Sequence, residues 1–347
     1  MRILIPFTLA ILAAAISAQE PTPAPPAEAI IKDGKLTDPV WNFTYEARGL
    51  ERGLATPARG VLFEGRAAGG IQIAVRVMEA PKELEGAKWR EMAKASFSKA
   101  KRKMQDVVES SEGTPTLTFT ESKLDIFTEE HGYAFYPRGY QCFVVHAFVA
   151  DKTETSGKRI SECLNGLKAA KGAGPTMQAF MLSMESGLPI DDPRILIESG
   201  RRYSAEGAGR NLTLAMRVLK QARKAIKPDS LPAPVIWQLY ETGGHAQLAS
   251  DPRDLKGAIE WLTLAEQAAA KMPEEQRANA AGLSAYNLAC AYSLAGEIEK
   301  GYEALYRSLK DKLIVDAGHL TSDTDLNNLK KDTERWDKFW KERVAGR

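Results

Sequence analysis

The sequence predicts an α+β sandwich domain followed by an all-α domain of helical repeats. Three observations lead to this fold class. Strand-like runs alternate with two helix-like segments over 30–170, the stretch 168–176 is rich in glycine and other small residues, and helix-like segments dominate from residue 175 onward. With 347 residues, 44% of them hydrophobic and 27% charged, the chain is long enough for two folded soluble domains.

The N-terminus has the layout of a secretory signal peptide. Arg2 precedes an apolar run over 3–16, which ends at the small pair Ser17-Ala18. The run is shorter than the roughly 20 residues that span a bilayer. We therefore expect a signal peptide over 1–18, a proline-rich linker over 19–29, export to the periplasm or the exterior, and no stable membrane anchor after cleavage.

The charge balance argues against nucleic-acid binding. Of the 47 Lys and Arg side chains one, Arg2, leaves with the signal peptide, so the mature chain has 46 basic side chains against 45 acidic ones. The densest basic run, "KASFSKAKRKM" (94–104), alternates with apolar residues at helical spacing. We expect it to form the solvated face of an amphipathic helix over 85–111.

The first domain is predicted to hold a mainly antiparallel sheet covered by that helix and by a second one over 155–170. The last strand is apolar on both faces and is therefore expected at the centre of the sheet. The strand-like runs are "VLFEG" (61–65), "GIQIAVRVME" (70–79), "TPTLTFTES" (114–122), "KLDIFTEE" (123–130) and "GYQCFVVHAFVA" (139–150). The order of these elements resembles that of PsbP-like sandwich domains.

The second domain, 175–347, contains an internal repeat of 43 residues. The columns that share this spacing are Ala215, Ala258 and Gly301; Leu219, Leu262 and Leu305; and Ala222, Ala265 and Ser308. A fourth column, in the preceding helix of each unit, is Gly200, Gly243 and Ala289, spaced 43 and then 46 residues. Small residues at these positions let two helices approach closely, and the leucine fills the space between units.

The stretch "YNLACAYSLAGEIEKGYEALYRSL" (286–309) resembles a tetratricopeptide repeat. The family positions are Leu288, Ala289 and Tyr292 in the first helix, Gly296 near the turn, and Gly301, Leu305 and Ser308 in the second helix. The resemblance implies three units, 194–228, 234–272 and 279–312, and a C-terminal capping helix. The units exceed the 34-residue norm, so a related class of roughly 40-residue helical repeats stays open.

Few residues could support catalysis or bind a metal. Cys142 and His146 on one strand would stand roughly 13 Å apart, beyond hydrogen-bond reach. Asp125, Glu129, Glu130 and His131 could form an oxygen-rich metal site if the chain folded back, but a hairpin turn with solvated charges is the favoured interpretation. We therefore predict no catalytic residue, no metal and no cofactor.

The three cysteines leave one pairing open. Cys142 and Cys163 lie in the same domain of a chain that we expect to be exported, so a disulfide between them is conceivable. The sequence does not give the distance between them. Cys290, in the repeats, would stay unpaired.

The resemblance to tetratricopeptide repeats implies a scaffold that binds a peptide or protein segment in a concave groove. The groove candidates by register are Arg194, Ile197, Arg201, Trp237, Tyr240, Tyr286, Asn287, Cys290 and Ser293. Their aromatic and basic groups suit an extended peptide with acidic character, although a structural role for them is also open. The alternative is an enzyme or small-ligand carrier with His131, Tyr133, Tyr136 and Arg138 at the mouth of a pocket in the first domain.

Overall fold

The structure is a computed structural model that describes residues 29–345 with short gaps at 53–59, 81, 124–126, 170–173, 208, 228–229 and 311–316. The predicted signal peptide, and the predicted linker up to residue 28, lie outside the described residues. Among the residues that are described, no helix combines the length and the apolar character needed to cross a bilayer.

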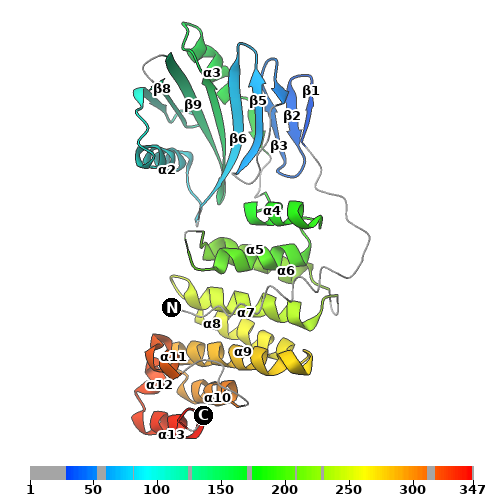
Figure 1. Cartoon of the computed structure of the whole chain (residues 1–347), viewed down its shortest axis with the longest axis vertical. Coiled ribbons are helices and arrows are strands. Elements are labelled where there is room, and N and C mark those ends of the chain that lie inside the picture. Colours follow the sequence, from blue (N-terminus) through cyan, green and yellow to red (C-terminus); the bar gives the residue numbers. More distant parts are fainter. Residues whose placement is uncertain are drawn as a thin grey trace. The chain divides into compact units, whose positions relative to one another are not determined.

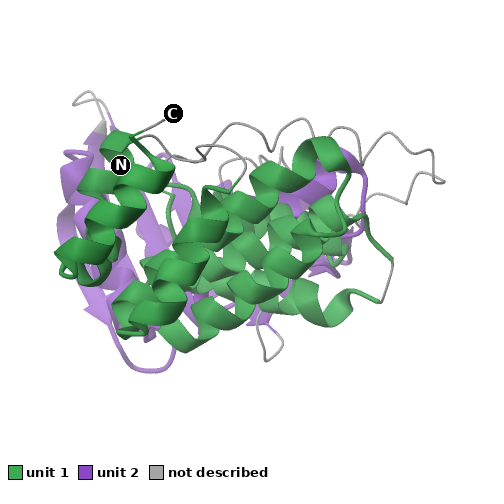
Figure 2. Cartoon of the chain, turned by 90° about the horizontal axis from the view of Figure 1, so that it is seen from below, with its two compact units in different colours: residues 1–22, 191–347 green, residues 23–190 purple. Residues whose placement is uncertain are grey.

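The chain divides into an N-terminal unit, residues 23–190, and a C-terminal unit that begins at residue 191 (Figure 2). The sequence suggested a boundary within the glycine-rich stretch 168–176, with the second domain from residue 175, whereas the C-terminal unit begins at residue 191. The reason is local. Leu167–Ala169 forms strand β11, and helix α4 (Met177–Ser186) follows it within the N-terminal unit. The fold class is as predicted, an α+β region followed by an all-helical region (Figure 1).

The N-terminal unit contains two antiparallel sheets. The smaller has the order β1 (Ile30–Lys32), β2 (Lys35–Asp38), β3 (Phe43–Glu46), β11. The larger has the order β4 (Glu51–Arg52), β5 (Val61–Ala67), β6 (Ile71–Glu79), β10 (Gln141–Val149), β9 (Phe127–Arg138), β8 (Thr116–Lys123), β7 (Gln105–Ser110). Strand β10 is the middle strand of the larger sheet, as its two apolar faces predicted.

The two helices predicted for this unit form but are shorter than expected. Helix α2 covers Gly86–Lys99 rather than 85–111, because Lys101 adopts a positive φ of 56° and the chain continues as strand β7. Helix α3 covers Ser156–Leu164 rather than 155–170, because the residues that follow pair with β3. The apolar periodicity of both stretches continued past the points where the chain turns.

The larger sheet separates two hydrophobic clusters. Phe143 and Val145 of β10 pack with Ile160 of α3 on one side, whereas Cys142 and Val144 belong to the cluster on the side of α2. Successive side chains of a strand point to opposite faces. Cys163 of α3 is in the first cluster, and both cysteines are free. The disulfide that the sequence left open is therefore not formed.

The described residues at the start of the C-terminal unit form six helices in three consecutive pairs. They are α5 (Pro193–Ser204) with α6 (Leu212–Ala225), α7 (Ala233–Ala249) with α8 (Leu255–Ala269), and α9 (Glu274–Ala295) with α10 (Ile298–Ser308). The second helices begin at Leu212, Leu255 and Ile298, 43 residues apart each time. Asn211 and Asp254 cap the first two of these by accepting hydrogen bonds from backbone N–H groups.

Glycines allow the helices within a pair to approach closely. A Cβ atom on Gly200 would come within 2.5 Å of Leu219, and one on Gly244 would come within 2.5 Å of Leu262. The neighbouring Gly243 lies against Trp261 instead. In the second pair Gly244, not Gly243, therefore has the role that Gly200 has in the first, and the register of α7 is one residue later than the sequence suggested.

The last described segment covers α9 and α10. It consists of α11 (Ala317–Ser322), the short 3₁₀ turn η2 (Thr324–Leu326), α12 (Asn327–Lys330) and α13 (Thr333–Arg343). Leu326, Leu329 and Phe339 are fully buried in one cluster with Tyr302 of α10. The Tyr302 hydroxyl also donates a 2.9 Å hydrogen bond to the Leu329 carbonyl.

Candidate functional sites

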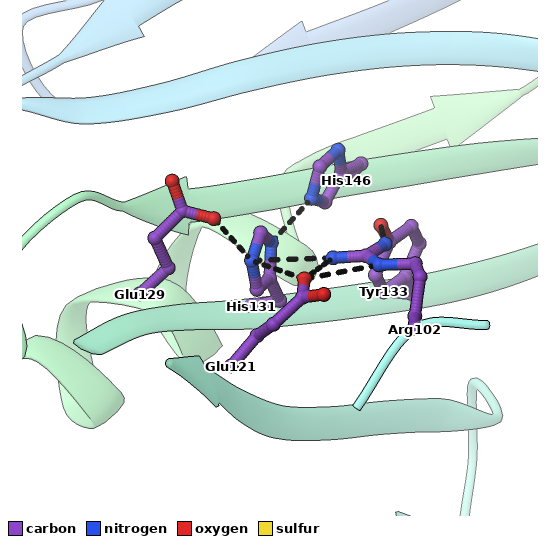
Figure 3. A network of polar contacts seen from close by, with 6 residues as sticks. All are labelled: Arg102, Glu121, Glu129, His131, Tyr133 and His146. Atoms are coloured by element: carbon purple, nitrogen blue, oxygen red, sulfur yellow. Dashed lines mark hydrogen bonds and ion pairs between the residues drawn. The ribbon is translucent and has the colours of Figure 1, made fainter. Parts of the chain in front are cut away.

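A network of polar side chains lies on the α2 side of the larger sheet (Figure 3). Glu121 comes from β8, Glu129 and His131 from β9, and His146 from β10. The register of β8 on β9 pairs Glu121 with Glu129. Because residues two apart on a strand share a face, Glu129 and His131 point to the same side of the sheet.

Arg102, directly after the turn that ends α2, supplies the positive charge of the network. Its Nε and Nη2 atoms donate to Glu121 Oε2 at 3.1 and 2.6 Å, and its Nη1 atom donates to the Tyr133 hydroxyl at 3.1 Å. The guanidinium also lies 5.0 Å from the centres of the Phe97 and Phe119 rings. Burial opposes the charge, but these hydrogen bonds outweigh it and raise the pKa of Arg102.

The two histidines form a relay toward Glu129. His131 Nδ1 lies 3.1 Å from His146 Nε2, and His131 Nε2 lies 3.0 Å from Glu129 Oε2. If His131 Nε2 carries the proton and donates to the Glu129 carboxylate, His131 Nδ1 accepts a hydrogen bond from the Nε2–H group of His146. Burial, and then the Arg102 charge, lowers the pKa of His131. Burial also holds the pKa of His146 well below its ordinary value.

The prediction that Glu129, Glu130 and His131 lie in a hairpin turn is wrong, because all three belong to strand β9. His131 lies in the middle of a twelve-residue strand and is buried. Asp125 lies outside the described residues, and Glu130 points to the other face, where it accepts a hydrogen bond from Ser156 of α3. The residue that joins Glu129 and His131 is instead Glu121, which the sequence analysis did not single out. Only the pairing of β8 with β9 identifies it.

The four residues of the alternative site do not meet in one pocket. His131 and Tyr133 face α2, whereas the Tyr136 hydroxyl donates to the Leu164 carbonyl of α3. Arg138 donates a 2.7 Å hydrogen bond to the Trp41 carbonyl, on the side of the smaller sheet. His131 and Tyr133 are an odd number of positions from Tyr136 and Arg138 along β9, which places the two pairs on opposite faces.

An open cleft of about 1200 Å³ lies elsewhere in the N-terminal unit. It contains none of the four residues above. Its charged lining residues are Lys32, Asp33, Lys35, Glu46, Arg48, Arg159 and Glu162. Lys35 and Glu46, register partners on β2 and β3, form an ion pair of 3.1 Å.

In the first helix pair the groove candidates are held within their own helix. Arg194 bonds the Asp192 carboxylate at 2.8 and 3.0 Å, and Arg201 bonds Glu198 at 2.6 Å. Ile197 is fully buried. The two arginines are partly exposed and remain reachable, whereas the Ile197 side chain is part of the helix packing.

In the second pair the two candidates point into the packing between helices. Trp237 Nε1 donates to Ser284 of α9 at 3.0 Å, and Tyr240 lies edge-on to Trp261 of α8. The one-residue register shift of α7 explains this placement, because one residue rotates a side chain by about 100° around a helix. Counted from Gly244, the positions equivalent to Arg194 and Ile197 are Gln238 and Glu241.

In the third pair the C-terminal segment covers most of the candidate surface. The Tyr286 hydroxyl donates to Asp323 at 2.6 Å, and the Cys290 thiol lies 3.6 Å from the same carboxylate. Ser293 is fully buried, and its carbonyl accepts a 2.8 Å hydrogen bond from Asn328. The chain itself therefore occupies this part of the expected groove. Asn287 is the partly exposed exception.

Asn287 belongs to a polar contact between α7 and α9 that the sequence analysis missed. Glu241 accepts hydrogen bonds from Asn287 Nδ2 at 2.5 Å and from the Ser284 hydroxyl at 2.6 Å. Burial raises the pKa of this carboxyl. One turn earlier on α7, Gln238 is 3% exposed, and its Nε2 has no hydrogen-bond partner among the described residues. The consecutive Gly243 and Gly244 allowed two registers, and only packing decides between them.

Comparisons with known proteins give no family. No protein-family model and no curated protein matches the chain. One solved structure that it resembles comes from Bacteroides thetaiotaomicron VPI-5482. It is 11% identical, with a TM-score of 0.30 over 66% of this chain and 79% of that one. A likeness of this size supports no statement about function.

Proposed function

We propose that this chain is an exported protein-interaction protein that binds a peptide or protein segment through its tetratricopeptide-like helical repeats and performs no catalysis. The observation that carries the proposal is the unsatisfied side-chain amide of Gln238 on α7. Its amide nitrogen is buried without a hydrogen-bond partner among the described residues, next to the Glu241–Asn287 contact. An unsatisfied buried donor costs roughly 1–3 kcal/mol. That nitrogen is itself shielded from solvent, so the Gln238 side chain would rotate toward the surface to bond a backbone carbonyl of an extended peptide.

The charges of α5 favour a partner with acidic side chains. Arg201 and Arg202 both bond the single carboxylate of Glu198, at 2.6 and 3.2 Å. Both guanidinium groups are partly exposed. On α7 the raised pKa of Glu241 weakens the repulsion that its carboxylate would exert on an acidic ligand.

An enzyme or small-ligand carrier with its site in the N-terminal unit is less well supported. The side chains proposed for that site lie on both faces of the larger sheet. The two on the α2 side, His131 and Tyr133, both contact Arg102. A shared pocket would have needed all four on one face.

The proposal is tested by capture of partners from an envelope fraction with the full chain as bait, read by mass spectrometry. Gln238→Leu removes the buried donor, and Gln221→Leu makes the same change at an exposed position of α6. We expect a partner that is retained by the wild type and by Gln221→Leu but lost with Gln238→Leu. Capture of the same proteins by all three chains would contradict binding at this face.

A further inference from the structure

Three side chains of the polar network have their ligand atoms close enough to share one metal ion. Atoms of Glu121, Glu129 and His131 all lie within 4.8 Å of one another. His131 Nε2 is 3.0 Å from Glu129 Oε2 and 3.8 Å from Glu121 Oε2. Metal–ligand bonds of about 2.0–2.4 Å from a central cation span such separations.

A positive group already lies against two of these three side chains. Arg102 Nη2 is 2.6 Å from Glu121 Oε2 and 3.3 Å from His131 Nε2 (Figure 3). The guanidinium thus stands beside the atoms that a cation would bind. Its long side chain is about one-fifth exposed, so it can swing away without opening the sheet.

The surroundings favour an ion of the transition series. One imidazole and two carboxylates are a donor set that Zn²⁺ accepts, whereas Mg²⁺ and Ca²⁺ prefer oxygen alone. His146 Nε2 can accept a hydrogen bond from a protonated His131 Nδ1 across their 3.1 Å contact. In that tautomer the lone pair of His131 Nε2 is available to the metal. The Glu129 side chain is 16% exposed, so the site is reachable from water.

We propose that Glu121, Glu129 and His131 form a site for one divalent transition-metal cation of the Zn²⁺ type, for which Arg102 competes. When the ion binds, the guanidinium leaves the Glu121 carboxylate and water completes the coordination. The site lies in the N-terminal unit and is independent of the peptide binding proposed for the repeats.

The test is calorimetric titration of the full chain with Zn²⁺. Arg102→Gln removes the competing charge, and we expect it to bind one equivalent at least tenfold more tightly than the wild type. Glu129→Gln and His131→Gln, each added to Arg102→Gln, should lose that site. Circular dichroism of each protein checks that it is folded. If His131→Gln does not fold, the Glu129→Gln variant still tests the site, because Glu129 is the more exposed ligand.

Adding His319→Gln to Arg102→Gln provides the matched control. His319 lies in the C-terminal unit, 3.7 Å from Asp323. We expect it to leave the tight site unchanged. The proposal is overturned if Arg102→Gln binds Zn²⁺ no more tightly than the wild type, if the tight site survives Glu129→Gln, or if His319→Gln abolishes it.

Discussion

Asn287 on α9 donates a hydrogen bond of 2.5 Å to the buried carboxyl of Glu241 on α7. The Ser284 hydroxyl donates to the other oxygen at 2.6 Å, and Trp237 donates to Ser284. A polar chain therefore links the first helices of two successive helix pairs. Its donors are neutral, so the contact does not depend on an ion pair.

Removing the acceptor should destabilise the C-terminal unit. Glu241→Leu leaves the buried Ser284 hydroxyl and the Asn287 amide without their acceptor, at a cost of roughly 2–4 kcal/mol in the free energy of unfolding. Glu241→Gln keeps one acceptor oxygen and should cost about 1 kcal/mol. Urea unfolding followed by circular dichroism measures both. Equal stability of Glu241→Leu and the wild type would show that the contact contributes nothing.

The pH dependence of stability should carry the signature of Glu241. Burial raises its pKa in the folded state above the ordinary 4.5, so the folded state binds the proton more tightly than the unfolded state. The wild type should therefore lose stability relative to Glu241→Gln as pH rises from below 4.5 through the raised value. Urea midpoints of both proteins from pH 4 to pH 8 test this. A difference that is constant with pH would refute the shift.

Gly244 should resist even the smallest substitution. A Cβ atom there would lie 2.5 Å from Leu262 Cγ and 3.3 Å from the Leu262 backbone nitrogen. Overpacking costs roughly 1–3 kcal/mol, and the higher helix propensity of alanine returns about 1 kcal/mol of this. We expect a net loss for Gly244→Ala in thermal or urea unfolding. The control is Gly209→Ala, where a Cβ atom would meet no atom within 4 Å among the described residues beyond its chain neighbours.

The C-terminal segment, α11 to α13, should contribute strongly to the stability of the C-terminal unit. Phe339 is fully buried in the cluster that also contains Leu329 and Tyr302. Phe339→Ala should cost about 3–5 kcal/mol in the free energy of unfolding. Lys338→Ala, at the exposed neighbouring position, should cost less than about 0.5 kcal/mol. Similar urea midpoints for the two variants would mean that the segment is not part of the folded core.

The sequence predicted features that depend on periodicity. The three second helices, the central strand β10 and the change from strands to helices all follow from the spacing of apolar and small residues. Element ends were predicted less well, because the turn at Lys101 depends on a local backbone conformation. A short break in a helical pattern carries little signal.

The candidate sites depend on contacts between residues that are distant in the sequence, and most of these contacts could not be predicted from the sequence alone. Glu121 meets His131 only because β8 pairs with β9 in one particular register. Glu241, and not Tyr240, lies at the position equivalent to Ile197, because Gly244 and not Gly243 packs on Leu262. In both places a shift of one residue changes the face on which a side chain lies.

Peptide binding at α7 and α9 is tested most directly by the dissociation constant of a segment of the captured partner. Fluorescence anisotropy with the full chain would measure it for the wild type, Gln238→Leu and Gln221→Leu. We expect Gln238→Leu to weaken binding at least tenfold, equivalent to about 1.4 kcal/mol, while Gln221→Leu binds as the wild type does. The same dissociation constant for all three proteins would contradict a binding site on this face.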